Sequence, residues 1–533
     1  MRARVSVLLL LVCLSNAIGC SKKLELPPVA SPSPPPQAML HVAMSGESIE
    51  ARWVGSREKY TDHGENAFRT VSAEPLSTFS IDVDTASYAN VRRFLSEGTL
   101  PPEAAVRIEE LINYFKFDYP QPTGKEPFSI TTELAESPWN DQHRLVLIGL
   151  KGREIAESRT PRRNLVFLID VSGSMASRDK LPLVQHGLRM LAGTLNANDR
   201  VAIVVYAGAS GVVLESTAGD RKQRIDHAIA NLHAGGSTNG GAGITLAYKL
   251  ARENFIAGGV NRVILATDGD FNVGVISANE LERLIERERE SGVFLSVLGV
   301  GTGNINDTFM ELLADKGNGN YSYLDTMQEA HRVLVKEAGS TFVTIAKDVK
   351  IQVEFNPNLV NAYRLIGYEN RMLRDQDFND DRKDAGEIGA GHSVTAIYEI
   401  VPAGVAVDRP AVDSLKYLVS PQPAPASIPS QYENELLTVK LRYKAPDGDV
   451  SDLTSAVVMN RVSPLTANLG FASAVAEAGM LLRGSRLAKN ASYTSAIARA
   501  KQFRGEDPDG YRAEFARLLE VAAVLAKRQV TER

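Results

Sequence analysis

One alternation of strands and helices, from residue 164 to about residue 346, constrains the fold of this 533-residue chain more than any other feature. Its first strand, residues 165–169, is a continuous apolar run, which is typical of a central parallel strand that is covered on both faces. Further strands are predicted at residues 201–206, 262–266 and 293–300, and helices at residues 181–195, 221–232, 240–254 and 279–290. This order predicts a doubly wound, Rossmann-like α/β domain, whose ligands bind beyond the carboxyl ends of the strands.

The chain on either side of this domain predicts other architectures. Residues 74–160 combine two predicted helices, at 85–97 and 104–115, with alternating strands near 128–134 and 144–150. Residues 347–533 begin with predicted strands at 349–355, 394–400 and 437–443. They close with predicted helices at 465–482, 493–502 and 511–525. The predicted fold class is therefore a multidomain α/β protein: a central domain at residues 161–346, flanked by a small α+β domain and a β-rich, then helical, carboxyl-terminal domain.

The first residues predict export from the cytoplasm. Residues 1–19 contain two arginines, an apolar stretch at 5–14 and small residues at the end, as in a signal peptide. The following Cys20, preceded by Gly19, resembles the bacterial lipobox, which implies that Cys20 is lipidated. The alternative is a plain secretory peptide with an incidental cysteine. Residues 20–73 follow as a tether, rich in proline between 26 and 37, a composition that favours an extended spacer.

Composition excludes some classes of function. The formal net charge of −5 does not suggest a protein that binds nucleic acid. The chain has two cysteines, Cys13 and Cys20, so cleavage of the signal peptide leaves no thiol for a disulfide downstream.

The lipobox resemblance implies a lipid-anchored protein of the bacterial cell envelope. Because Ser21 rather than aspartate follows the cysteine, the outer membrane is favoured if the source is Gram-negative.

Three polar side chains follow the first strand of the α/β domain. Asp170, Ser172 and Ser174 fall on the loop at the carboxyl end of the sheet, where binding is expected. A carboxylate and two hydroxyls are hard oxygen ligands, which suit Mg²⁺, Mn²⁺ or Ca²⁺ rather than zinc or copper. The alternative is that these residues serve only as a turn and a helix cap.

The Asp-x-Ser-x-Ser sequence after a buried strand resembles the metal-ion-dependent adhesion site of von Willebrand factor A domains. That family completes the site with a threonine on a second loop and an aspartate after a later strand. Thr238, in the turn at residues 235–240, and Asp268, after the strand at 262–266, match these two positions. The resemblance implies a metal, Mg²⁺ by preference, that is held by Asp170, Ser172, Ser174, Thr238 and Asp268. It also implies a protein partner whose Asp or Glu carboxylate completes the metal shell.

A second resemblance covers the chain from about residue 75 to its end. Residues 80–93 and 384–392 look like segments of a bacterial lipoprotein family with a central A domain, an amino-terminal associated domain and a carboxyl-terminal domain of unknown function. The family implies an architecture and a location. It implies no established activity or partner.

Other acidic or glycine-rich motifs favour structural roles. Asp82 and Asp84 precede a predicted helix, where capping explains them better than cation binding does. Residues 375–381 begin like an EF-hand loop, but Asp380 stands where glycine is needed and Gly386 where the bidentate glutamate belongs, which indicates a solvated acidic loop. Residues 299–304 lack the third glycine of a dinucleotide fingerprint and predict a turn.

The sequence thus favours a binding protein over an enzyme, since it contains no Gly-x-Ser-x-Gly elbow, Walker loop or His-Glu-x-x-His motif. The first hypothesis is a membrane-anchored envelope protein that grips a protein partner through its metal. The alternative is a scaffold or assembly factor of an envelope complex in which the metal is structural. A hydrolytic enzyme that uses Ser172 or Ser174 ranks last, because it would need a nearby base.

Overall fold

The computed structural model describes residues 57–156, 160–237, 240–269, 278–338, 342–407 and 428–532. Residue contacts divide the chain into residues 1–54 and 55–533, and the described residues all belong to the second unit. The predicted signal peptide, the lipidation site Cys20 and the tether up to residue 56 lie outside the described residues, as do Thr238 and residues 408–427.

The predicted α/β domain is confirmed, and its sheet brings the expected strand ends together. The strand order is β10 (Tyr321–Leu324), β9 (Phe294–Val300), β8 (Val260–Thr267), β5 (Arg163–Asp170), β6 (Arg200–Tyr206) and β7 (Ser210–Ala218). Neighbouring strands pair in parallel except for the edge strand β7, which is antiparallel to β6. The sequence did not predict β7.

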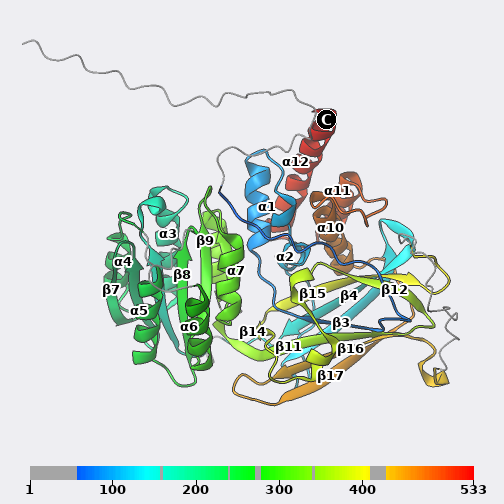
Figure 1. Cartoon of the computed structure of the whole chain (residues 1–533), viewed down its shortest axis with the longest axis horizontal. Coiled ribbons are helices and arrows are strands. Elements are labelled where there is room, and N and C mark those ends of the chain that lie inside the picture. The colour runs from blue at the N-terminus through cyan, green and yellow to red at the C-terminus, as the bar shows by residue number, and fades with distance from the viewer. Residues whose placement is uncertain are drawn as a thin grey trace, which may run out of the picture. The chain divides into compact units, whose positions relative to one another are not determined.

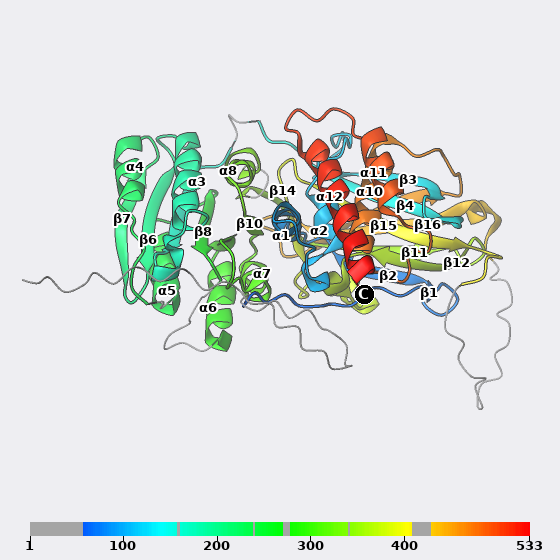
Figure 2. The same cartoon turned by 90° about the horizontal axis from the view of Figure 1, so that it is seen from above.

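Helices cover both faces of this sheet (Figure 2). One face carries α3 (Leu181–Thr194), α4 (Lys222–Ala230) and α8 (Met327–His331), and the other carries α5 (Gly240–Glu253), α6 (Ala278–Glu290) and α7 (Asp307–Lys316). Along β5, Leu165, Phe167 and Ile169 pack with the first set, and Val166 and Leu168 with the second. Burial on both faces explains the continuous apolar run, because successive side chains of a strand point to opposite sides.

Two further sheets form a β framework beside the α/β domain (Figure 1). The first has the order β1 (Arg69–Thr70), β12 (Val360–Ile366), β15 (Ser393–Pro402), β4 (Asn140–Gly152) and β3 (Phe128–Ser137). The second has the order β13 (Met372–Leu373), β2 (Leu76–Ser80), β11 (Thr344–Phe355), β16 (Glu435–Lys444) and β17 (Ser451–Met459), and β14 (Gly386–Gly389) also pairs with β11.

The α/β domain is an insertion in this framework. The sequence predicted instead that it lies between two separate flanking domains. Strand β4 precedes it and pairs with β15, which follows it, while β2 pairs with β11 in the same way. The two flanking segments that the sequence separates therefore share sheets. Residues 57–73, assigned by sequence to the tether, also join the folded unit, where β1 pairs with β12 and the backbone of Lys59 pairs with that of Ile305.

Helices cover the outer face of the first framework sheet (Figure 1). They are α1 (Ala86–Ser96), α2 (Ile108–Asn113), α10 (Ala467–Leu482), α11 (Tyr493–Gln502) and α12 (Tyr511–Glu532). The two framework sheets bury their inner faces against each other. Single helical turns complete the described elements: η1 (Glu103–Ala105), η3 (Gly173–Ala176), η4 (Arg332–Lys336), η5 (Glu369–Arg371), η6 (Asp375–Asn379) and η7 (Ser430–Tyr432).

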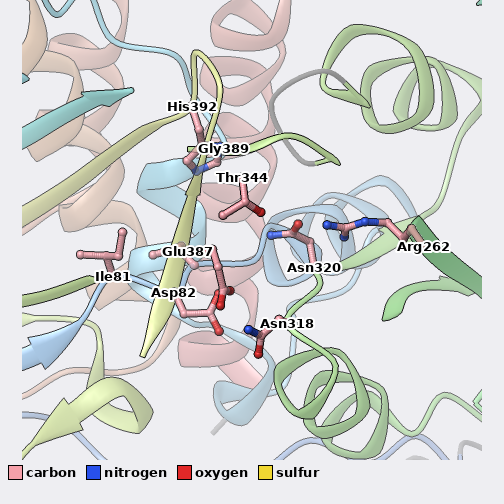
Figure 3. A pocket seen from close by; sticks show the side chains of 10 residues that line it. Ile81, Asp82, Arg262, Asn318, Asn320, Thr344, Glu387, Gly389 and His392 are labelled. Atoms are coloured by element: carbon pink, nitrogen blue, oxygen red, sulfur yellow. The ribbon is translucent and has the colours of Figure 1, made fainter. Parts of the chain in front are cut away.

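The two segments that resemble the lipoprotein family meet at the contact between framework and α/β domain. Asp84 does not cap α1; its Oδ1 accepts a hydrogen bond of 2.7 Å from the backbone N–H of Tyr321 in β10. Asp384 pairs with Arg289 of α6 at 2.6 Å. A cavity of about 20 Å³ lies here, lined by Glu387 and by Arg262 of β8 among others. Figure 3 shows these side chains. None of the described metal-site residues lines it.

Candidate metal centre

The first loop of the predicted site folds around the carboxylate of Asp170. This residue ends β5 and is fully buried. Its Oδ1 accepts a 2.8 Å hydrogen bond from the backbone N–H of Ser172, and its Oδ2 accepts longer ones from the hydroxyls of Tyr206 (3.2 Å) and Thr267 (3.3 Å). The hydroxyls of Ser172 and Ser174 lie 3.1 Å apart. Ser172 is buried, whereas Ser174 is exposed, so the loop opens toward solvent on one side.

The second loop lies against the first. The backbone N–H of Gly173 donates to the carbonyl oxygen of Gly236 at 3.0 Å, and Gly235 donates to Val171 at 2.7 Å. Gly236 has a φ of +86°, which L side chains rarely adopt, so glycine suits this turn. The structure thus holds residues 235–237 beside the Asp170 loop. Thr238 follows directly but lies outside the described residues, so its part in the site stays a prediction.

Asp268 comes from the neighbouring strand, as predicted. It follows β8, which pairs in parallel with β5, so both aspartates stand at the carboxyl ends of adjacent strands. Asp268 is fully buried, and its side chain is hydrogen-bonded to Ser174 of the first loop. Its Oδ2 also accepts a 2.9 Å charged hydrogen bond from Nζ of Lys180.

The two carboxylates have opposite pKa shifts. Burial raises the pKa of Asp170 above its usual value, and this outweighs its hydrogen bonds with Ser172. Burial alone would also raise the pKa of Asp268, but hydrogen bonds with Lys180, Ser174 and Asn304 together lower it. Asp170 is therefore the carboxylate whose ionised form lacks compensation by a nearby cation.

The residues present fit a hard divalent cation. Asp170, Asp268, Ser172 and Ser174 offer only oxygen ligands, and they come from two strand ends that the sheet places side by side. Lys180 supplies a positive charge at one of these oxygens. Across the described residues, no group of three or more His, Cys, Asp or Glu side chains is placed to hold a metal ion.

The sequence did not predict three contributors to the centre. Lys180, which directly precedes α3, and Asn304 lie around Asp268, while Tyr206 contacts Asp170. The predicted turn begins after β9: residues 299 and 300 end that strand, and residues 301–304 form the turn that supplies Asn304. A lysine before a helix and an asparagine in a turn are common, so neither gives a signal without the fold.

The acidic side chains of residues 375–381, which begin like an EF-hand loop, are paired with other side chains of this chain. In residues 375–381, Asp377 pairs with Arg374 at 2.7 Å, and Asp381 accepts a hydrogen bond from the hydroxyl of Ser451 at 2.6 Å. Asp380 pairs with Arg382 at 3.1 Å. These contacts favour a structural role over a calcium loop, but the predicted solvated loop is wrong in part, because Asp377 is buried in η6.

Comparison with known proteins agrees with this architecture. Residues 164–336 match the von Willebrand factor type A domain, residues 54–147 match a model described as von Willebrand factor, and residues 340–525 match the carboxyl-terminal domain of uncharacterized protein YfbK. Uncharacterized protein YfbK of Escherichia coli K12 is 46% identical over 471 residues, which are 87% of this chain and 81% of that protein. The chain belongs to the YfbK family.

More distant relatives of this YfbK-family protein share only part of its length. Inter-alpha-trypsin inhibitor heavy chain H4 of Sus scrofa is 28% identical over 163 residues, 30% of this chain and 18% of that protein. The solved von Willebrand factor type A structure from Catenulispora acidiphila is 15% identical, with a TM-score of 0.40, and the match covers 72% of this chain and 89% of that one. Von Willebrand factor type A domains commonly mediate protein–protein interactions, and they often bind a divalent metal.

Proposed function

We propose that this YfbK-family protein is a lipid-anchored envelope protein that binds Mg²⁺ at Asp170, Ser172, Ser174, Thr238 and Asp268 and uses it to bind a protein partner. The observation that carries the proposal is the pair of buried aspartates at adjacent strand ends, with two serine hydroxyls beside them. Mn²⁺ and Ca²⁺ have the same preference for oxygen ligands.

The surroundings of the site support a role in binding. When bound, the metal would supply an electrophilic centre that accepts an oxygen ligand from a partner's Asp or Glu side chain. Ser174 and residues 235–237 are exposed around the buried carboxylates, so a partner can approach from this side. The 2.8 Å hydrogen bond from the backbone N–H of Ser172 to Asp170 holds the loop in place before binding, which lowers the entropic cost of binding.

The test is capture of partners from native membranes with the full-length protein, with Mg²⁺ or with EDTA. We expect a captured protein that is lost with EDTA and with Asp170→Ala. Asp226→Ala is the matched control, because Asp226 lies in the same domain but is exposed, in a surface ion pair with Arg189. Capture that neither EDTA nor Asp170→Ala reduces would refute metal-dependent binding.

A second candidate is a scaffold or assembly factor in which the metal is structural. Buried ion pairs fasten the α/β domain to the framework helices: Arg92 to Asp325 at 2.5 Å, and Arg107 to Asp307 at 2.6 Å. An α/β domain that is fixed to the framework by buried ion pairs suits a rigid scaffold. This role predicts that Asp170→Ala lowers thermal stability while partner capture persists.

The membrane anchor has its own test. In the part of the chain that the structure describes, no helix has the length and apolar character needed to cross a membrane. We propose that lipidated Cys20 anchors the protein, in the outer membrane if the source is Gram-negative. Cys20→Ser should move the protein from the membrane fraction to the soluble fraction and abolish labelling by a fatty acid. A variant that stays in the membrane fraction would contradict the anchor.

The absence of enzymatic activity stays a prediction.

A further inference from the structure

A lysine side chain lies inside the candidate metal centre. Nζ of Lys180 donates a hydrogen bond to Oδ2 of Asp268 at 2.9 Å and another to Oδ1 of Asn304 at 3.2 Å. The side chain of Lys180 is 9% exposed, and that of Asp268 is 0% exposed. An ion pair this well shielded from solvent is screened only weakly by salt.

The surrounding turn holds Lys180 in this position. Gly301 has a φ of +75°, and a Cβ atom at residue 301 would overlap the methylene stem of Lys180. The absence of a side chain at residue 301 therefore leaves the channel through which the stem reaches Asp268. Asn304 closes the same turn and accepts the second hydrogen bond. The ammonium group is thus positioned by packing as well as by charge.

The charges of the centre show what this position means for a metal. Asp170 and Asp268 carry two negative charges, and Lys180 returns one positive charge to the carboxylate of Asp268. A divalent cation that uses Asp268 must share this carboxylate with an ammonium group. Two like charges at one carboxylate repel each other at short range, especially where little water separates them.

We propose that Lys180 is a positioning residue that lowers the affinity of the centre for divalent metal by competing for Asp268. Its charge also makes the metal-loaded centre net positive instead of neutral, which favours an anionic group on a partner. The proposal rests on the proposed function, because it concerns the same metal centre. It explains why the carboxylate of Asp268 has a charged partner whereas that of Asp170 has hydrogen bonds from hydroxyl and backbone groups.

The test is titration of the metal-free protein with Mg²⁺ in a calorimeter, without any partner. We expect Lys180→Met, which keeps the apolar stem and removes the charge, to bind Mg²⁺ at least about tenfold more tightly than the wild type. Lys180→Arg, which keeps the charge, should bind Mg²⁺ about as weakly as the wild type. Lys249→Met controls for overall charge, because Lys249 is exposed on α5 and pairs with Glu253.

The outcomes separate this role from a merely structural one. If Lys180 only supported the fold, its removal would loosen Asp268 and weaken Mg²⁺ binding, so equal or weaker binding by Lys180→Met overturns the proposal. If Lys180→Met does not fold, Lys180→Gln takes its place in the same titration, since an amide can still donate a hydrogen bond to Asp268 without carrying charge. Tighter binding by either variant supports the proposal, and unchanged binding refutes it.

The wild type and Asp170→Ala distinguish this proposal from the proposed function. If the wild type binds Mg²⁺ and Asp170→Ala does not, the metal centre stands, and the Lys180 variants test the inference alone. If neither the wild type nor any Lys180 variant binds Mg²⁺ at millimolar concentration, the metal centre itself is refuted, and the inference with it.

Discussion

The ion pairs of Arg92 provide a quantitative test of how the α/β domain is fixed to the framework. Arg92, on helix α1, donates to both oxygens of Asp325 at 2.7 and 2.5 Å and to Oε2 of Glu329 at 2.8 Å. All three side chains are at most 5% exposed. Arg92→Leu would leave Asp325 buried without its arginine, whereas Glu329 would keep its pairing with Arg332.

The expected loss follows from this burial. Removing one partner of a buried ion pair typically costs about 3–5 kcal/mol of the free energy of unfolding, because a charge is left without compensation. We expect Arg92→Leu to fall in this range at pH 7.5, as measured by urea unfolding. Arg69→Leu is the matched control: Arg69 pairs with Glu74 at 2.9 Å, but the two side chains are 42% and 53% exposed. An exposed pair of this kind contributes at most about 1 kcal/mol.

The pH dependence gives a second and stricter criterion. Burial already holds the pKa of Asp325 above its ordinary value, and loss of Arg92 raises it further. A carboxyl group whose folded pKa is raised destabilises the fold above its unfolded pKa, and this penalty disappears as protonation sets in at lower pH. The deficit of Arg92→Leu should therefore shrink between pH 7.5 and pH 5. A deficit below about 1 kcal/mol at pH 7.5, or one that does not change with pH, would refute the reasoning.

Three further predictions concern metal, acid and backbone. Mg²⁺ at one hundred times its Kd should stabilise the wild type by about 2.7 kcal/mol, and Asp170→Asn should abolish this shift in thermal melts. Without metal, the variant should melt no lower than the wild type, because the buried charge is gone. A retained shift would count against the site. Burial would raise the pKa of Glu329, but Arg332 and Arg92 outweigh it and lower this pKa to about 2. The contribution of Glu329 to stability is therefore complete above its ordinary pKa and is lost as pH falls toward 2. Glu329→Gln should flatten the acid side of a plot of unfolding free energy against pH, and an unchanged slope would argue against this role. Gly301→Ala should lower the free energy of unfolding by more than about 1 kcal/mol, through its positive φ and its overlap with Lys180, whereas a neutral effect in urea unfolding would show that the turn can relax.

Local patterns in the sequence determined the α/β domain and most of its candidate metal ligands. The apolar run at residues 165–169 predicted a central strand because a strand buried on both faces has no polar alternation. Asp170, Ser172 and Ser174 could be placed at the binding edge because they follow that strand directly. Periodicity also predicted helix α11 with its observed bounds, since one turn of a helix repeats within a few residues.

Only the tertiary structure decided which remote segments meet. The pairing of β4 with β15 and of β2 with β11 joins residues on either side of the α/β domain, and the backbone hydrogen bonds of such ladders leave no pattern in the side chains. Asp84 reads like a helix cap in sequence, yet it accepts its hydrogen bond from Tyr321. The contact between Lys180 and Asp268 depends on residues 88 positions apart and on the missing side chain of Gly301. The sequence thus determined where the oxygen ligands lie, and the fold decided that a lysine shares the centre with them.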